Sequence, residues 1–363
     1  MRGFFLFLLA ASAMAQSAQT YPTYTSENLR GVSAVSRQVA WVSGTHGTYL
    51  RTTDGNIWTP DQVPGAEALD FRAAVAFSAD EAFLMSAGSG EQSRIYHTVD
   101  AGRHWDLQFT NKNPKGFFDS MVFWDSTHGV VLGDPIADEA GKLKFELLMT
   151  SDGKTWSSIT ANLPPAIEGE GAFAASNSCI AVLPAQGDSV AGSDSNLWFA
   201  TGGKAARVFH SADRGKTWQV SETPIAHGPD SAGIFSIAFR DATHGILAGG
   251  DYKHPDEDGP NLASTNDGGK TWTLSAIHPQ AYFSDVAYDR KYKSPNSKNL
   301  DDNRAQVRIF LANPKFLFDF RPPADPTRIS PPKQSSMEFN AIAPYPEGGA
   351  LVVGPKGSIA RIP

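Results

Sequence analysis

Short apolar segments recur along the chain, separated by polar stretches rich in glycine, aspartate and serine. The most apolar segment of every repeat is residues 39–42, 81–85, 130–133, 197–200, 246–249, 307–311 and 350–354. Runs of four or five apolar residues bounded by turn residues are typical of buried β-strands. The pattern therefore predicts an all-β protein made of repeated small sheets, with one fully buried strand in each.

A seven- or eight-residue motif, Ser/Thr-x-Asp-(x)-Gly-x-x-Trp, follows five of these segments. Its Asp and Trp residues are Asp54 and Trp58, Asp100 and Trp105, Asp152 and Trp156, Asp213 and Trp218, and Asp267 and Trp272. Consecutive aspartates are separated by 46 to 61 residues. Repeats of this length indicate the blades of a propeller rather than a helical array.

Each part of the motif has a physical role in a tight turn. The Asp carboxylate can accept hydrogen bonds from backbone amides just ahead of it, and Gly readily takes a positive φ. The Trp ring is large enough to pack against the neighbouring blade. We therefore interpret these ten Asp and Trp residues as structural.

The motif resembles the Asp-box (BNR) repeat, and the chain resembles Asp-box β-propellers along its whole length. Within them it is most similar to the photosystem II assembly/stability-factor-like family and its uncharacterised bacterial relatives. This resemblance implies a propeller of four-stranded antiparallel blades and a role as an exported scaffold that captures a polypeptide. Sialidases belong to the same superfamily.

Counting the apolar strands predicts a single seven-bladed propeller over residues 16–363. The expected blades are residues 29–60, 70–109, 117–160, 168–221, 233–276, 281–321 and 337–363, the last completed by residues 20–26. Pairing of the N- and C-terminal segments would close the ring and remove exposed sheet edges. The sixth blade is irregular, because residues 321–326 contain three prolines where the repeated motif should stand.

The first 15 residues contain one arginine, a short apolar run and an Ala-x-Ala ending, which predicts a secretory signal cut after Ala15. No apolar run is long enough to predict a membrane span. We expect an exported monomer, periplasmic or extracellular. The net charge of −7 argues against binding of nucleic acid by bulk charge.

Aligning the expected first strand of every blade exposes one polar position, which should form a ring around one mouth of the central channel. Its residues are Arg30, Arg72, Asp119, Glu170, Ser236, Ser284 and Asn340. Loops expected on the same face add Asp134, Lys204, Arg207, Asp251 and Tyr252. These twelve residues are the candidate binding site. The alternative interpretation is a collar of hydrated or paired polar groups without a ligand.

Two functions from different classes remain open. A scaffold could grip a carboxylate-bearing peptide end with Arg30, Arg72 and Arg207, because guanidinium groups bind carboxylates in a bidentate manner. A glycoside hydrolase could use Asp119 and Glu170 as acid and base. The ligand is accordingly expected to be a protein, a peptide or a glycan.

Other chemistries find no support in the sequence. A sialidase would carry its Arg-Ile-Pro motif near the N-terminus, whereas here Arg361-Ile362-Pro363 ends the chain, so we do not expect a typical sialidase. Cys179 is the single cysteine and is expected to be a buried thiol. The acidic run 256–258 lacks the ligand spacing of a calcium loop, and neither a metal nor a cofactor is predicted.

Overall fold

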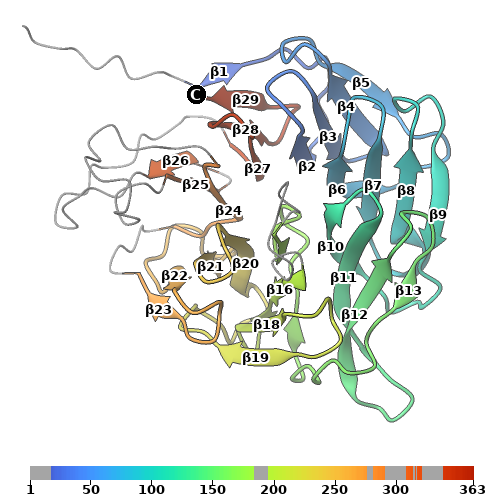
Figure 1. Ribbon diagram of the computed structural model, residues 1–363. Helices are drawn as coiled ribbons and strands as arrows, with labels where there is room; N and C mark the ends of the chain where they lie inside the picture. Colours follow the sequence, from blue (N-terminus) through green and yellow to red (C-terminus); the bar gives the residue numbers. More distant parts are fainter. Residues whose placement is uncertain are drawn as a thin grey trace, which may run out of the picture.

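Small antiparallel sheets stand around a central axis in the computed structural model (Figure 1). The structure describes residues 18–183, 195–275, 281–290, 308–313, 315, 317–320 and 338–363. The predicted signal of residues 1–15 and the proline-rich stretch 321–326 lie outside the described residues. None of the described residues forms a helix with the length and apolar character of a membrane span.

Five blades follow one another along the chain, each running from an inner to an outer strand. Blade one contains β2 (Leu29–Ala34), β3 (Ala40–Gly44), β4 (Thr48–Thr52) and β5 (Thr59–Gln62). Blade two contains β6 (Asp70–Ala76), β7 (Ala82–Ala87), β8 (Arg94–Thr98) and β9 (Asp106–Thr110), with a short 3-10 turn at Gly90–Gln92. Blade three contains β10 (Phe118–Asp125), β11 (His128–Ala137), β12 (Leu143–Thr150) and β13 (Ser157–Ser158).

Blades four and five are joined through an extra ladder. Blade four contains β15 (Ile180–Val182), β16 (Leu197–Ala200), β18 (Arg207–Ser211) and β19 (Gln219–Glu222). Blade five contains β20 (Ala232–Phe239), β21 (Gly245–Asp251), β22 (Leu262–Thr265) and β23 (Thr273–Leu274). Two short strands, β14 (Glu170–Gly171) and β17 (Gly202–Gly203), extend the sheet of blade five to six strands.

The remaining strands form a three-stranded sheet and a closing blade. The three-stranded sheet contains β24 (Asp285–Tyr288), β25 (Ile309–Ala312) and β26 (Leu317–Phe320). The closing blade contains β27 (Ala341–Pro344), β28 (Ala350–Val353), β29 (Ile359–Ile362) and the N-terminal strand β1 (Gln19–Thr20). β1 pairs with β29, so the two ends of the described chain meet in one blade, at residues 19–20 rather than over 20–26 (Figure 1).

The prediction of seven four-stranded blades is wrong. The described residues form six four-stranded blades, and the sheet of β24, β25 and β26 has only three strands. The sequence after β26 begins Arg321-Pro322-Pro323 and lies outside the described residues. Proline has no amide hydrogen to donate to a sheet ladder, which makes this sequence unsuited to a regular outer strand.

The hydrophobic core lies between neighbouring sheets rather than inside any one of them. Trp41 and Tyr49 of blade one, for example, pack with Phe71 and Leu84 of blade two. The second strand of each blade is buried on both faces, as in β7, which explains its unbroken apolar sequence. Every blade therefore depends on its neighbours for burial of its apolar surface.

The five repeated turns share one hydrogen-bond pattern. In each, the Ser or Thr hydroxyl donates to the Asp carboxylate at 2.7–3.2 Å. In the turn of blade four, the Asp213 carboxylate also accepts the amide of Thr217 at 2.8 Å, and Gly215 has a φ of +82°. Trp105 packs edge-on against Trp41 of the preceding blade, with ring centroids 6.1 Å apart. The motif thus closes a turn and joins adjacent blades.

Candidate functional site

Four first strands begin with the same irregularity, which marks the inner rim of the propeller. The pairing register shifts around Arg30 in β2, Arg72 in β6, Asp119 in β10 and Phe235 in β20. Each of these residues is the extra residue of a β-bulge, a feature that redirects a side chain and often lies next to functional sites. The bulges therefore place these four side chains at equivalent positions around the centre.

Two residues of the predicted ring occupy other places. Ser236 pairs with Ala248 in the regular ladder of blade five, so Phe235 takes its expected position at the bulge. The first strand of blade four is β15, preceded by Cys179, whereas Glu170 belongs to β14. The bulge in β20 and the ladder between β14 and β17 each displace the expected ring position of their blade. Neither feature can be recognised from the local sequence.

Glu170 is locked in a buried ion pair. Its side chain is fully buried, and Oε1 accepts hydrogen bonds from Arg207 Nε at 2.9 Å and from the Thr201 hydroxyl at 2.6 Å. Oε2 accepts the Ile167 amide at 2.8 Å and contacts Arg207 Nη2. Since both carboxylate oxygens and the Arg207 guanidinium group are engaged, this geometry favours neither an acid–base role for Glu170 nor ligand binding by Arg207.

Asp119 is a buried acid, and Asp134 is a half-buried one. Burial and the nearby Asp134 raise the pKa of Asp119 well above its ordinary value, while Arg72 opposes the shift. One oxygen of Asp119, Oδ2, is buried without a hydrogen-bond partner among the described residues. Asp134 Oδ1 accepts the amide of Ala172 at 3.0 Å, and burial raises its pKa. Burial thus makes ionisation of both carboxyl groups less favourable than in water.

Arg30 and Arg72 are the cationic part of the rim. Arg72 donates to Asp70 Oδ2 at 2.6 Å and to the carbonyl oxygen of Ala174 at 2.5 Å. Burial, and then the positive charge of Arg72, lower the pKa of Arg30. Two guanidinium groups on adjacent blades thus lie close enough to repel each other.

The other predicted ring residues connect sheets. The Ser236 hydroxyl donates to Asp285 Oδ1 at 3.0 Å, and Ser284 donates to the backbone oxygen of Asn340 at 3.1 Å. Asn340 in turn donates to the carbonyl of Leu29 at 2.8 Å. These three side chains are buried, and their bonds tie blade five, the three-stranded sheet, the closing blade and blade one together.

The predicted loop residues differ in their exposure. Lys204 is exposed, and Asp251 accepts a hydrogen bond from His254 Nδ1 at 2.9 Å. The Tyr252 side chain is 48% exposed. Asp256 of the acidic run pairs with Lys315 at 2.6 Å. Across the described part of the chain, no three His, Cys, Asp or Glu side chains gather as a metal site would require.

An irregular segment of residues 172–178, here named the central segment, contacts several sheets at the middle of the propeller. Its carbonyl at Ala174 accepts from Arg72, and Asn177 exchanges two hydrogen bonds with the backbone of Met121, at 2.7 and 3.0 Å. The Ser176 hydroxyl donates to the carbonyl of Ser284 at 2.7 Å. The sequence did not single out this segment, because its contacts join residues more than 50 positions apart.

Aromatic residues form another part of the rim. Phe235 stacks on Phe173 of the central segment, with ring centroids 3.8 Å apart and planes at 12°. Tyr282 lies edge-on to Phe235 at 4.7 Å, and Tyr252 lies edge-on at 6.2 Å. The rim is therefore divided into a cationic part on blades one and two and an aromatic part around blade five.

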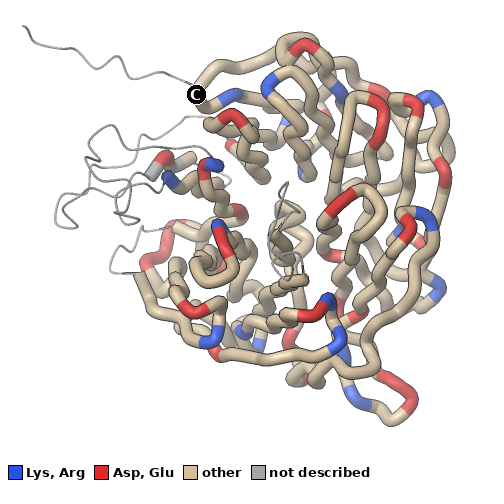
Figure 2. Tube along the Cα trace, viewed as in Figure 1, with Lys and Arg blue, Asp and Glu red and all other residues tan. Residues whose placement is uncertain are grey.

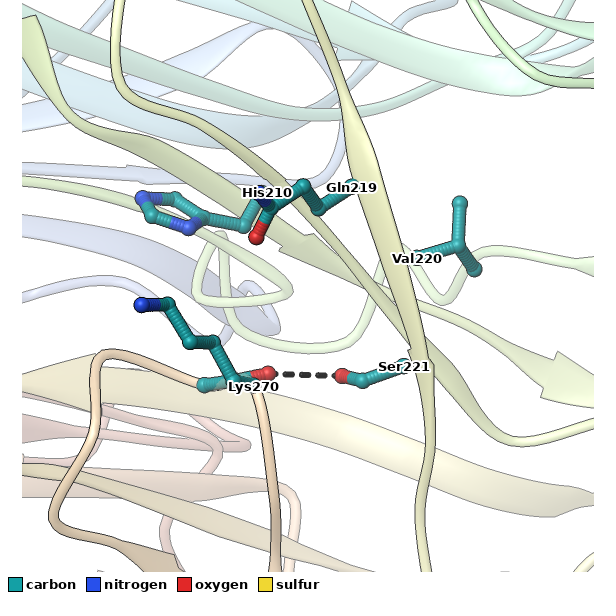
Figure 3. A pocket seen from close by; sticks show the side chains of 6 residues that line it. His210, Gln219, Val220, Ser221 and Lys270 are labelled. Atoms are coloured by element: carbon teal, nitrogen blue, oxygen red, sulfur yellow. Dashed lines mark hydrogen bonds between the residues drawn. The ribbon is translucent and has the colours of Figure 1, made fainter.

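A separate cavity of about 370 Å³ lies between the outer strand of blade four and the turn of blade five (Figure 3). The Ser221 hydroxyl on its wall donates to the carbonyl of Gly269 at 2.7 Å. Burial and the nearby Lys270 lower the pKa of His210 to about 4. The wall thus contains the neutral imidazole of His210, the Lys270 side chain, and the hydrogen-bonded Ser221 and Gly269.

Comparison with known proteins identifies the fold. No family model matches the chain, and no curated protein matches it. Among solved structures, U3-55K is similar at a TM-score of 0.60 and 10% identity, covering 96% of this chain and 99% of its own. The WD40 β-propeller domain of Doa1 is similar at a TM-score of 0.58 and 10% identity, covering 96% and 97%. YCF48 bound to D1 peptide covers 95% of this chain and 96% of its own, at 16% identity and a TM-score of 0.40.

The first two similarities and the arrangement of the sheets define the class of protein. The chain is a β-propeller, with six four-stranded blades and one three-stranded sheet in its described residues. At 10% identity these similarities concern the fold alone. The function must be argued from the residues of the rim.

Proposed function

We propose that this propeller is a scaffold that captures a polypeptide through its rim, with Arg30 and Arg72 holding a carboxylate group of the partner. The observation that carries the proposal is the equivalent position of these two arginines, each at the β-bulge of the first strand in adjacent blades. The positive charge of Arg72 contributes to the lowered pKa of Arg30, after burial. Like charges held together in a partly buried place are costly, and an anionic ligand relieves that cost.

The local charge balance supports an anionic partner. Asp70 pairs with Arg72, whereas Arg30 forms no ion pair among the residues that the structure describes. Asp119 favours its neutral form because it is buried. The two arginines therefore share one ion pair among the described residues, that of Arg72 with Asp70. Acidic and basic residues are mixed around the rest of the propeller (Figure 2).

The proposal can be tested with a library of free-acid decapeptides and the same library with amidated C-termini. Immobilised protein should retain free-acid peptides preferentially, and Arg30→Gln should weaken retention at least tenfold. The matched control is Arg103→Gln, an exposed arginine in the repeated turn of blade two. Equal retention of acid and amide peptides, or equal effects of the two substitutions, would contradict a carboxylate site at the rim.

Export and the monomeric state are part of the same proposal. The charged, apolar and small-residue order of residues 2–15 supports a cleaved signal. N-terminal sequencing of protein recovered from the exported fraction should begin at Gln16. Light scattering of that protein should give the mass of one chain, and a larger mass would contradict the monomer.

A further inference from the structure

The central segment contacts the rim residues Arg72 and Phe235 in the way that a bound peptide would. It has no regular secondary structure, and Phe173, Ala174 and Asn177 are only partly buried. Its backbone and side chains nevertheless bond to blades two, three and five and to the three-stranded sheet. Phe173 and Ala174 are therefore reachable from solvent, and the contacts that hold them are of a kind that a second chain can also make.

The Phe173 ring lies in a notch formed by Gly202, Gly233 and Phe235. A Cβ atom on Gly202 would lie 2.2 Å from Phe173 Cε2, and one on Gly233 would lie 2.9 Å from it. The two glycines face each other in the ladder between β17 and β20, so any larger residue would fill the space of the ring. The notch is therefore shaped for a flat side chain that stacks on Phe235.

The next residue of the same segment meets the cationic part of the rim. The Ala174 carbonyl oxygen accepts a hydrogen bond from Arg72 at 2.5 Å. One short stretch of chain thus places an aromatic ring in the notch and an oxygen on the guanidinium group of Arg72. A free carboxylate at the position of Ala174 would add a charge to that contact and strengthen it.

We infer that the central segment is an intramolecular ligand of the rim, and that the partner displaces it with an aromatic residue directly preceding its C-terminal residue. This inference rests on the proposed function, since it names the partner chemistry of the same site. It explains why glycine stands at both Gly202 and Gly233, and why an aromatic residue occupies the bulge of blade five. It also predicts that the free protein holds its own site closed.

The test uses the peptide acetyl-Gly-Ala-Phe-Ala with a free carboxylate, which copies residues 171–174. Its affinity is measured by calorimetry for the wild-type protein and for Phe173→Ala, in which the notch is empty. The Phe173→Ala protein should bind the peptide at least tenfold more tightly than the wild type. Replacing the peptide's Phe by Ala should abolish this gain.

A second variant covers the case in which Phe173→Ala does not fold. Asn177→Ala keeps the notch but removes both hydrogen bonds to Met121, so it should loosen the segment and raise peptide affinity several-fold. Phe109→Ala is the matched control, because Phe109 is a partly buried aromatic residue on the outer strand of blade two. Equal peptide affinity in the wild type, Phe173→Ala and Asn177→Ala would overturn the intramolecular ligand.

The two proposals fail in different ways. If the decapeptide library shows a carboxylate preference that depends on Arg30 while Phe173→Ala changes nothing, the rim binds peptides but the central segment does not compete. If the tetrapeptide binds Phe173→Ala equally as acid and as amide, the notch binds the aromatic ring, but the carboxylate site is contradicted. If the tetrapeptide binds neither Phe173→Ala nor Asn177→Ala, the inference is contradicted directly.

Discussion

Glu170 and Arg207 form a two-pronged ion pair in the interior, although 37 residues separate them along the chain. The Glu170 side chain has no exposed surface, and that of Arg207 is 11% exposed. Removing one partner of such a pair leaves the other charge buried without compensation, which costs far more than the intact pair contributes.

Glu170→Gln is therefore expected to lower the free energy of unfolding by about 3–5 kcal/mol. Urea denaturation followed by tryptophan fluorescence measures the change. Glu91→Gln is the control, because Glu91 pairs with Lys112 on the surface and both side chains are more than half exposed. The control should leave the denaturation midpoint unchanged. A midpoint equally unaffected in Glu170→Gln would show that the pair is not buried as described.

The sequence predicts the repeated parts of this fold because their interactions are local. In the turn of blade four, Ser211 and Thr217 both bond to Asp213, within seven residues of chain. The buried second strands are equally evident as apolar runs. The prolines of residues 321–326 predict an irregular sixth blade, but they lie outside the described residues. The predicted number of four-stranded blades was wrong.

The site is less predictable, because its geometry depends on contacts between distant segments. A β-bulge adds one residue to β20, so Phe235 and not Ser236 stands on the rim. The sequence Glu170-Gly171-Ala172 resembles the start of a first strand, yet it pairs with Gly202 and Gly203. Arg30, Arg72 and Asp119 were placed at equivalent positions because all three blades carry the same bulge.

Asp285 should make stability depend on pH between about pH 4 and pH 7. Burial raises its pKa to about 7, even though Ser236, Ser178 and the Ile342 amide donate to it. The folded state therefore keeps a proton that the unfolded state releases near pH 4, and stability is lost as pH rises from about 4 to 7. The slope for one such group is about 1.4 kcal/mol per pH unit.

Asp285→Asn should reduce that slope, since asparagine does not titrate. Thermal unfolding of both proteins at several pH values between 4 and 8 measures it. The pKa values of the buried Asp119 and the half-buried Asp134 are shifted in the same direction, so part of the dependence should remain. An identical pH profile for the variant would exclude Asp285 as a contributor.

Trp198 joins blades four and five through a bond and a stack. Its indole Nε1 donates to the carbonyl of Gly268 at 2.9 Å, and its ring stacks on Phe239 at 3.8 Å. Trp198→Phe keeps an aromatic ring but leaves the Gly268 carbonyl without this donor. The expected cost is about 1–3 kcal/mol in urea denaturation. Peptide binding at the rim should be unchanged, because neither Trp198 nor Gly268 belongs to the rim.

The repeated turns should respond to acid in the opposite sense to Asp285. Burial opposes ionisation of Asp213, but hydrogen bonds from Thr217 and Ser211 outweigh it and hold its pKa at about 2. The folded-state pKa is depressed, so this stabilisation is complete above about pH 4 and is lost as pH falls toward 2.

Asp213→Asn should therefore lower the melting temperature at pH 7, and the difference in melting temperature from the wild type should narrow between pH 4 and pH 2. The control is Asp106→Asn, an exposed aspartate outside the repeated turns, which should show no such convergence. A constant gap down to pH 2 would mean that the Asp213 carboxylate does not close the turn through its charge.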